Sequence, residues 1–205
     1  IAMQDLDIRG AGNLLGAEQS GFITDMGFET YQKILAEAME ELGMETGITT
    51  KGKDDSFLSD CTIETDQLAL IPDSYIDVTA EKIRIYKELD SLTSVKDINS
   101  MKERLSDRFG PLPEELLRLF DIVLIRQLGQ KLGFEKIIIK NGVMIAFFIS
   151  NPLSQYYKSD RFSKVLENIT LNPKIFELKQ NDSKLRIFSR NIDSISKAYE
   201  VLKKL

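Results

Sequence analysis

Glycines near the start of the chain come closest to a nucleotide-binding pattern. Gly10, Gly12 and Gly16 approach the G-x-G-x-x-G spacing that wraps a dinucleotide pyrophosphate, but the third glycine comes one position too late. A true fingerprint follows a strand and opens a helix, whereas the residues up to Phe28 are repeatedly interrupted by glycine. The spacing therefore does not predict a dinucleotide site.

A second stretch, Gly47 to Asp54, resembles a phosphate-binding P-loop. That loop requires Ser or Thr after its lysine to hold magnesium, but Asp54 follows Lys53 here. The carboxylates of Asp54 and Asp55 would also repel phosphate, and no apolar strand precedes the stretch. We interpret residues 46–60 as a linker.

Composition excludes several kinds of chemistry. The chain has no histidine, which rules out a histidine base or a histidine-ligated zinc within it. Its one cysteine, Cys61, cannot form an internal disulfide and has no basic neighbour to activate it, so we expect an inert thiol in the cytoplasm. No convergent carboxylate pair stands out among 32 acidic residues. We therefore expect no catalytic residue, cofactor or metal within this chain.

Charge is unevenly distributed along the sequence. The net charge is −5, but residues 1–70 carry −10 and residues 71–205 carry +5. This asymmetry fits either separate solvated surfaces or complementarity with other parts of a larger assembly. No apolar run approaches the roughly 20 residues of a membrane span. Aromatic and basic residues alternate over 156–162, which fits either a surface that stacks nucleic acid or the packing of a helix start.

Hydrophobic spacing predicts the elements that position these residues. Four stretches share apolar residues at helical intervals: 28–42, 77–89, 94–109 and 113–132. Asp77 is a possible cap, Ser94 begins a variant capping box, Pro113 suits the first helical position, and Gly133 suits a helix stop.

The pattern changes to strands at Phe134. Asn141-Gly142 joins two apolar runs and is a strong hairpin signal, and a second hairpin is predicted around residues 180–183. Helices are predicted over 159–169 and 191–205. The fold class is therefore α+β: helical segments followed by an antiparallel sheet with helices on one face.

The most specific feature is the run from Asp5 to Gly21, which resembles the motif that follows the last helicase motif in RecG-type superfamily 2 DNA translocases. The later segments Leu70-Ile-Pro-Asp73 and Asp107-Arg-Phe-Gly110 resemble, in that order, the family of bacterial transcription-repair coupling factors. The chain also begins without an initiator methionine, so we expect a piece of a longer protein.

This resemblance implies an ATP-dependent double-stranded DNA translocase that pushes stalled RNA polymerase off lesions and recruits nucleotide excision repair. ATP and Mg would bind elsewhere in the complete protein. Residues 1–45 would hold the end of the translocation motif and the following helix, and 61–205 a C-terminal regulatory domain, divided into 61–133 and 134–205. That domain would pack on the protein's own N-terminal module for the repair protein UvrA.

Two groups of residues are the candidates for these roles. Arg9, Gly10, Gly12 and Gln19 fall in the translocation motif, where a forked cation on a glycine loop can contact a phosphate or carboxylate. For the interdomain contact we select charged residues expected on the solvent side of the helix at 113–132: Glu114, Glu115, Arg118 and Arg126. The alternatives are the C-terminal region of a RecG-type helicase or a stand-alone protein-interaction module.

Overall fold

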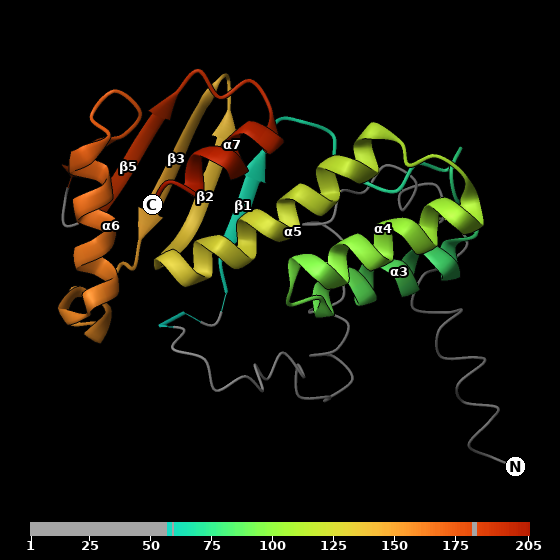
Figure 1. Cartoon of the computed structure of the whole chain (residues 1–205), viewed down its shortest axis with the longest axis horizontal. Coiled ribbons are helices and arrows are strands. Elements are labelled where there is room, and N and C mark those ends of the chain that lie inside the picture. Colours follow the sequence, from blue (N-terminus) through green and yellow to red (C-terminus); the bar gives the residue numbers. More distant parts are fainter. Residues whose placement is uncertain (1–56, 59, 182–183) are drawn as a thin grey trace, which may run out of the picture.

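The longest helix, α5 (Glu114–Leu132), connects a layer of helices to a five-stranded sheet (Figure 1). The computed structural model describes residues 57–58, 60–181 and 184–205. The motif at 5–21, the helix expected over 28–42 and most of the expected linker lie outside these residues. Helix α5 buries apolar side chains over most of its circumference in its middle turns, which is typical of an interior helix. Its buried residues include Leu116, Leu119, Phe120, Ile122, Val123, Leu124 and Ile125.

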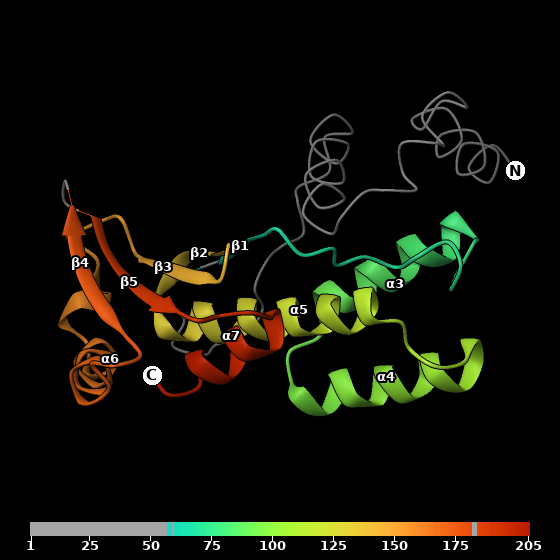
Figure 2. The same ribbon diagram turned by 90° about the horizontal axis from the view of Figure 1, so that it is seen from above.

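Helices α3 (Thr79–Ser91) and α4 (Val95–Phe109) lie beside the N-terminal half of α5 (Figure 2). The expected capping box at the start of α4 is confirmed, since the Ser94 hydroxyl accepts a hydrogen bond from the Asp97 amide at 3.1 Å. Asp77 is not the cap of α3, because the carbonyl of Val78 accepts the first helical hydrogen bonds. Pro113 likewise precedes α5 as its N-cap, with its carbonyl bonded to the amides of Leu116 and Leu117.

The sheet contains β1 (Thr62–Thr65), β2 (Phe134–Lys140), β3 (Val143–Phe148), β4 (Glu177–Asn181) and β5 (Lys184–Arg190). Their spatial order is β1-β2-β3-β5-β4. Strands β2 to β5 pair antiparallel, but β1 pairs parallel to β2, with Ile63 opposite Ile137. The α+β class is confirmed, and the sheet is mixed rather than purely antiparallel. Three helices separate β1 from β2, and such a long crossover permits parallel pairing.

Both predicted hairpins are present. In the β2–β3 turn, Asn141 and Gly142 have φ angles of 53° and 71°, the left-handed conformation that a two-residue hairpin requires. Strand β4, the first strand of the second hairpin, begins only at Glu177. The amides of Ile175 and Phe176 bond instead to the carbonyl of Asn172, which holds the intervening residues in a turn.

Helices α5, α6 (Asp160–Leu171) and α7 (Ile195–Leu202) lie on one side of the sheet, as Figure 2 shows. No described helix covers the other side of strands β2 to β5. The buried side chains of the strands, including Ile137, Met144 and Ile187, join α5 and α7 in one hydrophobic core. Among the residues that the structure describes, the sheet therefore has one face covered by helices and one face without them.

The aromatic stretch at 156–162 belongs to this core. It forms the short 3₁₀ helix η1 (Gln155–Lys158) and the start of α6. Tyr156 is fully buried and donates its hydroxyl hydrogen to the carbonyl of Leu132. Tyr157 donates to the carbonyl of Ile149 at 2.5 Å, and its ring lies 5.0 Å from that of Phe162. The structure thus favours the packing interpretation of this stretch.

We expect Gly133→Ala to destabilise the protein strongly. Gly133 ends α5 with φ 80°, and a Cβ atom there would lie 2.2 Å from the buried Tyr156 ring. The matched control is Gly142→Ala, where φ is 71° but no atom lies within 4 Å. The control should lose about 1–2 kcal/mol of unfolding free energy from backbone strain alone, and Gly133→Ala at least about 2 kcal/mol more, as for other overpacked cores. Equal losses in urea unfolding would contradict the proposed steric role of Tyr156.

Candidate interdomain surface

Three of the four expected contact residues lie at the start of α5. The carboxylate of Glu114 pairs with Arg118 at 2.6 Å, and Arg118 also donates to the Leu68 carbonyl at 3.2 Å. Glu115 is half-buried and forms no ion pair with any residue that the structure describes. Leu68 and Leu117 are exposed beside these charges. The first turns of α5 thus present a mixed polar and apolar surface.

Arg126 occupies a different environment. Only 13% of its side chain is exposed, and its guanidinium donates to Asp60 at 2.6 Å and to Asp90. The expectation that Arg126 lies on the solvent side with Arg118 is therefore wrong. Eight residues turn a helix by about 80° beyond two full turns, which directs Arg126 toward α3 and β1. It ties together the chain before β1, the end of α3 and the middle of α5.

Burial and the charges around Arg126 shift the pKa values of Arg126 and of the neighbouring Cys61. Burial acts to lower the pKa of Arg126, but its hydrogen bonds to the carboxylates of Asp60 and Asp90, and the charges of those carboxylates, outweigh burial, so the net shift is upward. Next to it, burial and the Asp60 charge raise the pKa of the Cys61 thiol to about 12, against a smaller opposing effect of Arg126. Cys61 is fully buried, which agrees with the expectation of an inert thiol.

A groove that we did not predict lies between the C-terminal half of α4 and the turn into α5. Its volume is about 480 Å³, and its lining consists of Lys102, Glu103, Ser106, Asp107 and Leu112. Glu103 and Asp107 are exposed and form no ion pair with a described residue. The sequence does contain a signal for this surface: the two carboxylates are four residues apart on the polar side of a predicted helix, just before a Gly-Pro turn. We call these residues the α4–α5 groove.

Asp121 is a half-buried carboxyl group of α5 whose pKa is raised. Burial raises its pKa, Lys102 of α4 lowers it and Glu200 of α7 raises it, with a net upward shift. Among the described residues, no three acidic or cysteine side chains converge as a metal site, and no helix is long and apolar enough to cross a membrane. Arg9, Gly10, Gly12 and Gln19 lie outside the described residues.

The chain is similar to proteins of one known family. The family model of the TRCF domain matches residues 65–159. The transcription-repair-coupling factor of Rickettsia conorii is 33% identical over 198 residues, covering 94% of this chain and 16% of that protein. That of Bacillus subtilis is 42% identical over 122 residues, covering 60% of this chain and 10% of that protein. The chain thus spans about a sixth or less of these relatives.

A solved structure supplies the fold. The crystal structure of the C-terminal domain of a transcription-repair coupling factor superposes with a TM-score of 0.59 at 18% identity, covering 71% of this chain and 88% of that one. The described residues therefore have the α+β fold of that C-terminal domain. From the sequence matches, the chain belongs to the transcription-repair-coupling factor family and corresponds to its C-terminal part.

We expect Arg126→Leu to reduce the unfolding free energy by about 2 kcal/mol, between the values typical of exposed and buried ion pairs. The reason is that Asp60 and Asp90 would both lose their cation while Leu keeps the packing of the stem. Arg118→Leu is the control, because its pair with Glu114 is exposed and should contribute at most about 1 kcal/mol. Urea denaturation measures both; equal effects would argue against a structural role for Arg126.

The raised pKa of Asp121 leads to a pH-dependent prediction. Between the unfolded and the folded pKa the native state binds more protons, so this group makes stability fall as pH rises through that window. We expect Asp121→Asn to stabilise the protein at pH 7, with the gain shrinking as pH falls through the raised folded pKa and absent below about 4, the usual pKa of an aspartate. Thermal unfolding of both proteins across pH measures this, and a destabilised variant at pH 7 would contradict it.

Proposed function

We propose that this chain is the regulatory end of an ATP-dependent translocase on double-stranded DNA, and that its described domain holds the complete protein in a resting state. The complete protein would displace stalled RNA polymerase at lesions and recruit the repair protein UvrA in the cytoplasm. ATP and Mg would bind in parts of that protein outside this chain. Membership of the transcription-repair-coupling factor family supports this proposal.

The observation that carries the regulatory role is the group of unpaired carboxylates around the turn between α4 and α5. Glu103, Asp107 and Glu115 have no cation among the described residues, and Leu112 and Leu117 contribute apolar surface next to them. Interfaces that open and close within one protein are typically more polar than permanent ones. This surface suits a basic patch on the N-terminal UvrA-binding module.

The contact works as a clamp only if it favours one state. A domain that binds the resting conformation alone shifts the equilibrium by its differential affinity, typically about 1–3 kcal/mol or 5- to 150-fold. Salt should weaken such a contact, because exposed charges are screened over about 10 Å at 0.1 M ionic strength. In the same proposal Arg9, Gly10, Gly12 and Gln19 serve the translocation motif and couple ATP hydrolysis to movement.

The test is made in the complete protein. Deleting residues 61–205 should raise basal ATPase or translocation and increase the affinity for UvrA, since the resting state loses its clamp. The double reversal Glu103→Lys and Asp107→Lys should act in the same direction by about fivefold or more. The matched control is Glu167→Lys on α6, an exposed carboxylate away from the groove.

The control should leave ATPase, translocation and UvrA affinity unchanged. Equal values of all three quantities with and without residues 61–205 would contradict the proposed regulation. A response to the deletion but not to the double reversal would retain the clamp and remove the α4–α5 groove as its contact.

A further inference from the structure

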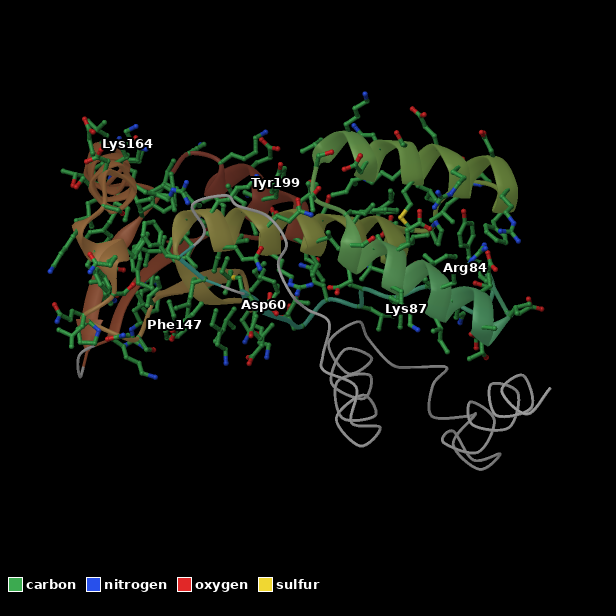
Figure 3. All side chains as sticks on the ribbon, turned by 90° about the horizontal axis from the view of Figure 1, so that it is seen from below. Asp60, Arg84, Lys87, Phe147, Lys164 and Tyr199 are labelled. Carbon is green, nitrogen blue, oxygen red and sulfur yellow. The ribbon has the colours of Figure 1, made fainter. Side chains whose placement is uncertain are left out.

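The face of the sheet opposite α5 and α7 carries aromatic side chains on its central strands. Phe147 of β3 lies opposite Arg186 of β5, and Ile145 lies opposite Phe188, so all four side chains share this face. All four are half-exposed. In Figure 3, Phe147 and Tyr199 of α7 lie on opposite sides of the sheet. We call this surface of β2 to β5 the open face.

Cations surround the aromatic residues. By strand register the open face carries six cations, namely Lys136, Lys140, Lys179, Lys184, Arg186 and Arg190. Within the five described strands two carboxylates accompany them: Glu64 pairs with Lys136 at 2.5 Å and with Lys140 at 3.5 Å, and Glu177 pairs with Lys179 at 3.0 Å and with Arg190 at 3.6 Å. The open face therefore has a clear excess of positive charge.

Arg186 lies at the centre of this charge. Its Nε atom is buried and has no hydrogen-bond acceptor among the described residues. Its guanidinium carbon lies 5.2 Å from the centroid of the Phe188 ring, close to the Lys179 ammonium at 4.8 Å from the same ring. A half-exposed guanidinium that lies over an aromatic ring presents a flat cationic surface, so this position suits a stacked base or an anionic group.

We propose that the open face binds single-stranded nucleic acid. Bases stack on Phe147 and on the Arg186 guanidinium above Phe188, while the surrounding lysines contact phosphates. Aromatic rings and guanidinium planes are the groups on which proteins stack unpaired bases, and flat sheets present them side by side. Single strands are favoured over duplex DNA, because bases that are already paired and stacked in a duplex are not available to stack on these side chains.

An acidic peptide is the competing occupant of a basic, apolar face. Such a peptide needs only cations at the rim and aliphatic surface in the middle, and Ile138 and Ile145 would provide the latter. The planar guanidinium over Phe188, with a second half-exposed aromatic residue diagonal to it, favours stacked bases instead. The two occupants respond differently to replacing Phe by Leu, which removes the ring and keeps the apolar surface.

The experiment uses the whole chain of 205 residues and fluorescein-labelled dT15 and rU15, with binding measured by fluorescence anisotropy. We expect micromolar dissociation constants at low salt, with log K falling against log salt at a slope of about −2 for three phosphate contacts. Phe147→Leu and Phe188→Leu should each weaken binding about tenfold, as expected for one lost stacking contact. Arg186→Lys should also weaken it, because the charge is kept but the plane is lost.

Matched charge reversals provide the control. Lys184→Glu on β5 should weaken binding at least fivefold, whereas Lys164→Glu, exposed on α6 on the covered side of the sheet, should have little effect. Urea unfolding of each variant shows that it remains folded. Three results would overturn the proposal: no binding of either oligonucleotide at 50 mM salt, equal losses from both reversals, or unchanged affinity in both Leu variants. Preferred binding of an acidic Glu- and Phe-containing 15-residue peptide would assign the face to protein instead.

Discussion

The burial of α5 is the constraint on which the rest of the described structure depends. A helix that buries most of the residues in its middle turns needs packing partners on several sides, and no single layer can supply them. The helix therefore passes from beside α3 and α4 at one end to the covered face of the sheet at the other (Figure 2). Near its C-terminus the packing is tight enough that a Cβ atom at Gly129 would lie 2.6 Å from the Cys61 sulfur. The absence of a side chain at Gly129 thus lets Cys61, the residue before β1, lie close against the helix.

Burial of α5 also decides what its charged residues can do. Arg126 is mostly covered, so it needs carboxylate partners within the domain and finds them in Asp60 and Asp90. Asp121 is half-buried without an equally good partner, and its raised pKa is the result. The first turns, where Glu114, Glu115 and Arg118 lie, are accessible for an outside contact. The same helix thus supplies structural charges in its middle and available charges at its start.

Local patterns in the sequence predicted local structure well. The Ser94 capping box, the Gly133 stop and the Asn141-Gly142 hairpin are each determined by a few adjacent residues, and all three are confirmed. The parallel pairing of β1 depends on contacts between residues more than 70 positions apart, which no local pattern encodes. The prediction that Arg126 faces solvent was wrong for a related reason. Spacing along a helix gives relative angles, but only tertiary packing tells which angle faces solvent.

The open face could not be predicted from the sequence, for the same physical reason. Phe147 and Phe188 lie 41 positions apart in the sequence, and only the pairing of β3 with β5 brings them onto one surface. The aromatic run at 156–162 is evident in the sequence as a candidate stacking surface, but it lies in the core because Tyr156 packs against the end of α5. The sheet and the α4–α5 groove lie at opposite ends of α5 (Figure 2). A partner in the groove would therefore leave the open face accessible, so a clamped state and nucleic-acid binding are geometrically compatible in one molecule.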